Sequence, residues 1–452
     1  MLIQFVVENF RSFRARTVLS MRAPEDMPDK PGLVVEAGGE RILRAAVLYG
    51  ANASGKSNVV KAMQFAQSLI REGTANKQSI PRQPFKLDPA GTERPSRFEW
   101  AFVEQGIQYA YGFLVDSERV IGEWLFRGAD SAEELVFARQ VDRATRKYSF
   151  EVGTSFITES QRRQFYEFVH EGTRPNQLFL CEAKERNVTE LEPVHAWFSR
   201  LAVLFPDTTF TPLMNAIEKD PDFAKEMGRL LQRFDTGVRS IRTRITKAPP
   251  EVNELARQLG IPAERSRQSV LMRSGLRPES ARIDDRGDFE HIRLVTEHTT
   301  PGEPVEFELD EESDGTMRLL HLAPVRYVPD GVFVIDEIDR SLHPLLTRVF
   351  LREFLSKPGT NSQLICTTHD THLLEGDLLG PESIWFTEKD QDGATHLYSL
   401  LDFDAGQLEV LQDGKQEGYL QGRFGAIPYL GDASRLPRKN TGEGGDGDGH
   451  ED

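Results

Sequence analysis

Apolar and polar positions at the start of the chain predict two strands, a buried strand and then a helix. Residues 3–10 (IQFVVENF) predict a strand, and residues 17–21 (TVLSM) predict its partner. Residues 44–49 (RAAVLY) form an apolar run that ends at Gly50, which is typical of a buried strand. After Lys56 the apolar residues recur at helical spacing, at Val59, Val60, Met63, Phe65, Ala66, Leu69 and Ile70.

The middle of the chain changes from strand to helix patterning. Residues 96–139 contain four strand-like runs separated by turn signals, which predicts a β-meander. From about 158 to 275 the spacing is helical and broken by prolines, with no heptad run that would predict a coiled-coil arm. Residues 290–297 (EHIRLVTE) return to strand patterning, and an α/β pattern continues to about residue 430.

These patterns predict an α/β protein with a mainly parallel sheet, a β-meander lobe and an inserted helical lobe. A chain of 452 residues exceeds what one hydrophobic core usually serves, so we expect several lobes. The expected segments are 1–155 for the first half of the main domain, 156–288 for the helical insert and 289–432 for the second half. Residues 433–452 are rich in glycine and acids, which predicts a disordered tail.

Composition restricts the class of protein. The net charge of -16 excludes a surface that is basic throughout, although local nucleic-acid sites stay open. No apolar stretch approaches the roughly 20 residues that span a bilayer, and the N-terminus lacks a signal-peptide pattern, so we expect no membrane association. Cys181 and Cys366 are far apart and in no metal-ligand spacing, which favours a reducing, cytoplasmic location over a disulfide scaffold or zinc site.

The strongest chemical signal is the segment 50–57 (GANASGKS), which matches the P-loop pattern G-x-x-x-x-G-K-S/T. Glycines let the backbone wrap around phosphate oxygens and present N–H groups at the start of a helix. Lys56 is expected to reach the β- and γ-phosphates of ATP, and the Ser57 hydroxyl to ligate Mg²⁺. A plain glycine turn is the alternative, but the flanking strand and helix favour the phosphate site. The predicted nucleotide-binding residues are Gly50, Asn52, Ala53, Ser54, Gly55, Lys56 and Ser57.

A second signal is the apolar run at 332–335 (VFVI) that ends in Asp336 and Glu337. Such a run predicts a buried parallel strand whose last carboxylates emerge at the ligand edge of the sheet. Asp336 is expected to hold Mg²⁺, and Glu337 to orient and deprotonate the attacking water. A strand end without chemistry is the alternative, and the P-loop elsewhere in the chain weighs against it.

Two further segments fit the same site. Ser313 and Gly315 (in EESDGT) open an apolar helix, where Ser313 suits a cap and Gly315 lets a phosphate approach the positive helix end. His369 follows the apolar run 364–366 and two threonines, where it is expected to contact the γ-phosphate. A helix cap alone and a structural histidine are the respective alternatives.

The order of these segments resembles the ABC-type ATPase head, the class shared with SMC-like and RecF-like ATPases. Gly50 and Asp336 are 286 positions apart, so a large insertion separates the two halves of the site. The resemblance implies a head-to-head homodimer with two ATP molecules sandwiched, in which Ser313 and Gly315 of one copy complete the site of the other. The opening run 9–13 (NFRSF) resembles the start of these heads, which implies that Arg11 and Ser12 lie near the nucleotide. Gln83 is the candidate for the glutamine-loop residue at the metal.

Three segments resemble a narrower group, the bacterial AAA/ABC-type ATPases of the RloA and AriA kind, which are linked to anti-phage defence and abortive infection. They are residues 311–320 (EESDGTMRLL), 338–344 (IDRSLHP) and 419–428 (YLQGRFGAIP). The signature departs from the Leu-Ser-Gly-Gly-Gln of transporters, so the contact with the second copy depends on Ser313 and Gly315. No acidic nuclease cluster follows the ATPase motifs, which favours a separate effector protein.

The stretch 239–286 has a different charge from the rest of the chain. It holds 11 Lys or Arg and 6 Asp or Glu, a balance of +5 within a chain of -16. The alternatives are a face for nucleic acid or for an acidic partner such as a phage protein, and an ordinary solvated surface. Just before it, Asp235-Thr236-Gly237 resembles a turn of the same family, and we assign it no role.

The leading hypothesis is an enzyme that converts ATP and water to ADP and phosphate and acts as a sensor and scaffold in anti-phage defence. ATP would close a dimer that holds or releases a separate nuclease or toxin. The alternative is a RecF- or SMC-like ATPase that binds DNA in repair or recombination. A scaffold that scarcely hydrolyses ATP is a third class, against which Glu337 argues.

Overall fold

The computed structural model describes most of the chain, and every structural statement below concerns these residues. They are 1–27, 30, 32–128, 133–142, 144–207, 211–247, 279–283, 289–299, 302–323, 325, 328–357, 359–376, 378–403 and 414–427. The predicted acidic tail and most of the basic stretch 239–286 therefore lie outside the described residues.

An antiparallel sheet of seven strands contains both the N-terminal strands and the predicted meander. Its order is β10-β9-β8-β7-β6-β1-β2. The N-terminal pair β1 (Leu2–Glu8) and β2 (Thr17–Ser20) is confirmed, and β1 also pairs with β6. The predicted meander is confirmed as β6 (Ser96–Glu104), β7 (Ile107–Val115), β8 (Val120–Arg127) and β9 (Glu134–Val141), followed by β10 (Tyr148–Val152).

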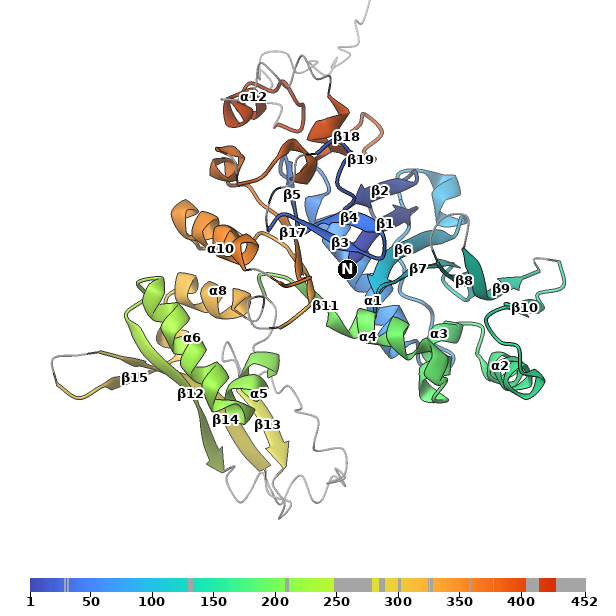
Figure 1. The fold of residues 1–452 in the computed structure, drawn as a ribbon, viewed down its shortest axis with the longest axis horizontal. Helices are drawn as coiled ribbons and strands as arrows, with labels where there is room; N and C mark the ends of the chain where they lie inside the picture. Colours follow the sequence, from blue (N-terminus) through green and yellow to red (C-terminus); the bar gives the residue numbers. More distant parts are fainter. Residues whose placement is uncertain are drawn as a thin grey trace, which may run out of the picture.

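A second sheet of six strands, mainly parallel as predicted, forms the centre of the molecule (Figure 1). Its order is β11 (Leu201–Leu204), β16 (Val332–Ile335), β17 (Gln363–Thr367), β5 (Ala45–Gly50), β18 (Ile384–Lys389) and β19 (Thr395–Ser399). Only the β18–β19 pair is antiparallel. Every residue of β5, β16 and β17 is buried, which explains why these strands are continuous apolar runs.

Helices pack against these sheets and connect them. The predicted helix after the P-loop is α1 (Lys56–Glu72), and α3 (Phe179–Glu185) and α4 (Glu192–Arg200) lie against it. The others outside the insert are α2 (Ser160–Gly172), α8 (Asp314–Leu322), α10 (Pro344–Ser356) and the short α12 (Lys415–Leu420). A small hairpin is formed by β3 (Val34–Ala37) and β4 (Glu40–Leu43). No described helix is long and apolar enough to cross a bilayer.

The expectation that residues 156–288 are helical is wrong for three described segments. One is β11, which joins the central sheet, and another is β13 (Glu279–Ile283). The third is β12 (Val238–Lys247), in which Ile and Thr alternate with Arg, a period that suits a strand. Together with α5 (Thr211–Lys219), α6 (Pro221–Arg233), β13, β14 (Phe289–His298) and β15 (Val305–Glu308), β12 forms a mixed α/β unit that we call the insert lobe. Figure 1 shows it at the lower left, on the opposite side from the meander.

Candidate functional site

Three of the four predicted chemical segments follow neighbouring strands of the central sheet: the P-loop follows β5, the Asp336-Glu337 pair follows β16 and His369 follows β17. The fourth, the signature, opens a helix instead. In the parallel registers, Thr367 lies opposite Leu48 and Thr387 opposite Gly50. The strand β16 ends at Ile335, opposite Cys366. The P-loop, the Asp336-Glu337 pair and His369 therefore leave the sheet at one edge, where parallel α/β sheets bind ligands.

The P-loop backbone needs glycine at two positions. Gly50 and Gly55 have φ of +152° and +118°, which side chains with a Cβ rarely adopt. A Cβ at Gly55 would also collide with Thr395, and a Cβ at Gly50 would collide with Thr387. The loop is held in place from β18, because the hydroxyls of Ser54 and Thr387 lie 2.6 Å apart.

Lys56 is buried at the start of α1 and folds back over the loop. Its Nζ donates to the carbonyl oxygens of Gly50 at 2.7 Å and Ala51 at 3.1 Å. Burial lowers its pKa from 10.5 to about 8, while the nearby charges of Asp336, Asp339 and Glu337 oppose that shift. The ammonium group and these carboxylates, nearly three hundred residues apart in sequence, thus belong to one electrostatic cluster.

A threonine that the sequence analysis did not select organises the carboxylate pair. The hydroxyl of Thr367 donates to Oδ1 of Asp336 at 2.7 Å and accepts from the N–H of Glu337 at 2.8 Å. One hydroxyl can fill both roles. Asp336 is buried, whereas the Glu337 side chain is 37% exposed and lies 3.4 Å from Arg340.

Glu337 has an unusual backbone with φ of +48°. Arg318, also missed by the sequence analysis, stabilises it from the signature helix. This buried guanidinium donates from Nη2 to the carbonyl oxygens of Asp336 at 2.9 Å and Glu337 at 2.6 Å. Desolvation lowers its pKa, and the neighbouring carboxylates, Asp339 foremost, oppose that effect. An arginine in an apolar helix face gives no sequence signal for this contact.

His369 lies beside the same cluster. Its side chain is exposed, and its backbone N–H donates to Oδ2 of Asp339 at 3.2 Å. Partial desolvation of the ring, and then the charge of Lys56, lower the pKa of His369, which favours the neutral imidazole near pH 7. The neutral ring keeps one N–H donor and one acceptor at the ligand edge.

The residues proposed for magnesium fit that ion. Ser57 is half-buried in the first turn of α1, and the Asp336 carboxylate is fixed by Thr367. One hydroxyl and one carboxylate suit Mg²⁺, which keeps several waters and takes its other ligands from phosphates. Among the described residues, no group of three or more His, Cys, Asp or Glu forms a metal cluster. The third proposed ligand, Gln83, has an exposed side chain.

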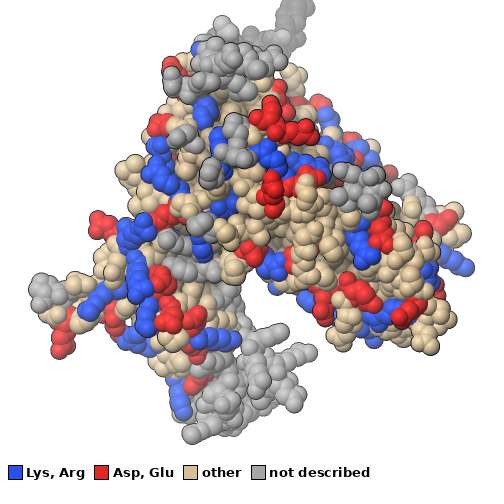
Figure 2. All heavy atoms as spheres, in the orientation of Figure 1, with Lys and Arg blue, Asp and Glu red and all other residues tan. Residues whose placement is uncertain are grey.

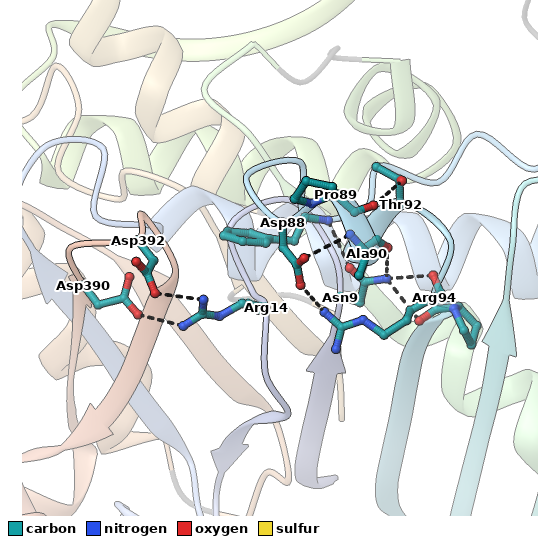
Figure 3. Close-up of polar contacts among 12 residues, drawn as sticks. Asn9, Arg14, Asp88, Pro89, Ala90, Thr92, Arg94, Asp390 and Asp392 are labelled. Atoms are coloured by element: carbon teal, nitrogen blue, oxygen red, sulfur yellow. Dashed lines mark hydrogen bonds and ion pairs between the residues drawn. The ribbon is translucent and has the colours of Figure 1, made fainter.

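The N-terminal run 9–14 contacts two other loops through the side chains of Asn9 and Arg14 (Figure 3). The amide of Asn9 donates to the carbonyls of Gly91 and Arg94, both at 2.7 Å, and thereby holds the loop 85–95. Figure 3 also shows Arg14 reaching Asp390 and Asp392, at 3.5 and 3.0 Å, on the β18–β19 hairpin. This run therefore joins two loops that border the nucleotide motifs.

Ser12 contacts the start of α1, and the neighbouring Arg11 contacts the loop that holds Gln83. The Ser12 hydroxyl accepts from Asn58 of α1 at 2.7 Å and lies 2.8 Å from the hydroxyl of Thr395. Arg11 has φ of +52°, its N–H donates to the carbonyl of Gln83 at 2.6 Å, and burial lowers its pKa. Contact of Arg11, Ser12 or Gln83 with a nucleotide stays a prediction.

The signature residues cap a helix and remain accessible. Ser313 is the N-cap of α8, and its Oγ accepts from the N–H of Thr316 at 3.1 Å. Its side chain is exposed. A Cβ added to Gly315 would lie 3.1 Å from the carbonyl oxygen of Ser341, so the turn packs against the segment that follows Glu337.

The C-terminal segment that carried part of the resemblance packs behind the P-loop. Tyr419 of α12 stacks on Phe386 of β18 at 5.5 Å, and its hydroxyl donates to the carbonyl of Ala426 at 3.2 Å. Burial raises the pKa of Tyr419, and a hydrogen bond from the N–H of Gly50 opposes that shift. The segment therefore supports the first residue of the phosphate loop.

Two arginines in the described part of the basic stretch are paired with acids. Arg242 of β12 pairs with Glu297 and Glu306, and Arg244 pairs with Glu306 and Glu308. Figure 2 shows basic and acidic side chains intermixed over the insert lobe. Arg242 and Arg244 therefore do not present unpaired positive charge to a nucleic acid.

The chain is similar to one described protein family and to solved structures. Residues 45–375 match the protein family described as AAA domain, putative AbiEii toxin, Type IV TA system. Among solved structures, the SMC head domain from Thermotoga maritima is similar at 13% identity and a TM-score of 0.37, covering 88% of this chain and 98% of that one. The SmcHead bound to the C-winged helix domain of ScpA is similar at 12% identity and a TM-score of 0.36, covering 90% and 99%. A search among curated proteins gave no match.

Proposed function

Because the chain belongs to the family of AAA domains described as putative AbiEii toxin, Type IV TA system, we propose that it hydrolyses ATP and couples hydrolysis to dimerisation. The observation that carries this proposal is the electrostatic cluster of Lys56 with Asp336, Glu337 and Asp339, bordered by His369. One lysine does not balance three carboxylates at the ligand edge of a parallel sheet, so the cluster favours a divalent cation beside the phosphate loop.

Each group has a role in this proposal. Lys56 neutralises charge on the β- and γ-phosphates, and Ser57 and Asp336 hold Mg²⁺, which supplies positive charge to the phosphate oxygens. Glu337 accepts the proton of the attacking water, since its carboxylate is accessible while its backbone is fixed. His369 donates an imidazole N–H to the γ-phosphate and so distinguishes ATP from ADP.

A second copy of the chain completes the site. Ser313 is exposed at the N-terminus of α8, where backbone N–H groups and the helix dipole favour an anion. The turn packs beside Ser341 and presents Ser313 outward. We assign Ser313 and Gly315 to the nucleotide bound by the partner copy.

The dimer is proposed to control a separate effector, a nuclease or toxin, in anti-phage defence. The family description, which names a putative toxin and a toxin–antitoxin system, supports this assignment. The RecF- or SMC-like DNA-binding alternative has less support, because Arg242 and Arg244 of the described basic stretch are paired with glutamates.

The test combines phosphate release with light scattering. Lys56→Ala is expected to abolish ATP binding, and Glu337→Gln to retain ATP and accumulate the dimer without turnover. Equal turnover in the wild type and Glu337→Gln would show that another group is the base.

Incubating the purified chain with DNA and Mg²⁺ or Mn²⁺ tests the effector assignment. Cutting that persists in Lys56→Ala would contradict a separate nuclease. DNA binding that ATP strengthens and salt weakens would instead support the repair alternative.

A further inference from the structure

The residue just before the signature serine is tied to the insert lobe. The Glu312 side chain is only 4% exposed, and its Oε1 lies 2.7 Å from Nε2 of His298. The same oxygen accepts a hydrogen bond from the hydroxyl of Thr296. Both partners lie on β14, so the central strand of the insert lobe holds the carboxylate next to Ser313.

The Asp235-Thr236-Gly237 turn, to which the sequence analysis assigned no role, lies against the imidazole of His298. Gly237 has φ of +78°, and a Cβ there would lie 3.3 Å from Nδ1 of His298. Phe307 of β15 packs on the same imidazole, with ring centroids 4.5 Å apart. His298 is thus confined between a turn of β12, a ring of β15 and the Glu312 carboxylate.

On its C-terminal side, the signature helix α8 is hydrogen-bonded to the loop that carries Asp336 and Glu337. Arg318, one turn further along α8, donates to the carbonyls of Asp336 and Glu337. The helix α6 of the insert lobe also lies against α8. The signature turn therefore stands between two anchors, one in the lobe and one beside the proposed base.

We propose that Glu312 is a positioning residue that makes Ser313 move with the insert lobe. A buried carboxylate that loses its donors leaves an unpaired charge away from water, so separating the lobe from the turn is costly. A shift of β14 is then transmitted to Ser313 and to ATP-dependent pairing of two copies. The effect on ATP-dependent dimerisation rests on the proposed function, whereas the coupling of Ser313 to the insert lobe through Glu312 does not.

Hydrogen–deuterium exchange on the full chain without nucleotide tests the tie. In Glu312→Ala, amides of residues 313–320 are expected to exchange about tenfold faster or more, because the cap of α8 loses its outer anchor. Gly237→Ala, which presses on His298 without touching the signature, is expected to act in the same direction. Arg242→Gln is the matched control: it removes ion pairs from the lobe sheet that do not include Glu312. Exchange of 313–320 that is equal in Glu312→Ala, Gly237→Ala and the control would overturn the proposal.

The second measurement separates positioning from general damage. In a Glu337→Gln background, Glu312→Ala and Gly237→Ala are expected to keep the affinity of the monomer for a fluorescent ATP analogue. Their ATP-driven dimerisation should weaken by about 5–150-fold, the usual range of coupling between sites. Equal losses in nucleotide affinity and dimerisation, with a lowered melting temperature, would mean that the contact is only structural. Failure of the parent protein itself to dimerise would count against the proposed function, and the exchange result would still decide the tie.

Discussion

Replacing Arg318 by methionine tests whether the signature helix holds the proposed base in its working position. The guanidinium is 3% exposed and donates from Nη2 to two consecutive carbonyls, at Asp336 and Glu337. Methionine keeps much of the apolar packing and removes both donors. We expect ATP turnover to fall while ATP binding at Lys56 persists.

The magnitude follows from the backbone of Glu337. A left-handed conformation costs a residue with a Cβ about 1–2 kcal/mol, and the φ of +48° must be held by its surroundings. Thr367 binds its N–H at 2.8 Å, and the N–H of Arg340 binds its carbonyl at 3.1 Å, so two ties remain after the substitution. If the two remaining hydrogen bonds do not compensate for the two that Arg318 supplied, the conformational cost of about 1–2 kcal/mol is no longer offset. The fraction of Glu337 in its working position then falls by about 5–30-fold. The value of kcat should fall by the same factor.

Phosphate release at saturating ATP, nucleotide affinity and thermal unfolding should be measured together. Arg340→Met is the control, because it keeps the backbone N–H that binds the Glu337 carbonyl and removes only an exposed side-chain contact with the Glu337 carboxylate, which contributes about 0–1 kcal/mol. A folded Arg318→Met protein whose kcat stays within about twofold of the control would refute the reasoning, since that ratio is under 0.5 kcal/mol.

Two further predictions concern the phosphate loop. Gly55→Ala is expected to abolish ATP binding in calorimetry, because its Cβ would collide with Thr395 at a φ of +118°, whereas Gly39→Ala, also at positive φ but with open space around it, should bind normally. The affinity for ATP should fall as pH rises through about 8, the lowered pKa of Lys56, and binding near that pH should take up a proton; an affinity that stays constant from pH 7 to 9 would contradict this. Since the folded pKa lies below 10.5, the unfolded chain binds more protons between about 8 and 10.5, so this lysine makes the nucleotide-free protein more stable as pH rises through that window.

The sequence predicted the central strands and the phosphate loop because their signals are local. Buried parallel strands are continuous apolar runs, and the P-loop has fixed glycine spacing, so β5, β16 and β17 were all expected where they occur. The meander was equally visible from its alternation and turns.

Other parts of the site depend on contacts between distant segments. Thr367 and Arg318 are ordinary residues of a strand and a helix, and only the folded arrangement brings them to the backbone of Glu337. Asp339 lies two residues beyond the carboxylate pair and has no local signal of its own, although its charge acts on both Lys56 and His369. The strand β12 was missed because long basic side chains masked the alternation of its Ile and Thr residues.

The edge strand β11 limits how this protein can be truncated or recombined. Residues 201–204 come from the stretch between the two halves of the P-loop domain, yet they pair in parallel with 332–335, and the carbonyl of Leu204 accepts the N–H of Asp336 at 2.9 Å. The side-chain amide of Gln67 on α1 also donates hydrogen bonds to the carbonyls of Phe198 and Leu201 in this segment. A deletion of residues 156–288 would remove the strand that pairs with β16 next to Asp336 and would leave an unpaired, aggregation-prone edge on the central sheet. A chimera that swaps residues 211–308, and leaves 192–204 in place, would keep the sheet of the insert lobe intact, since β15 pairs with β14.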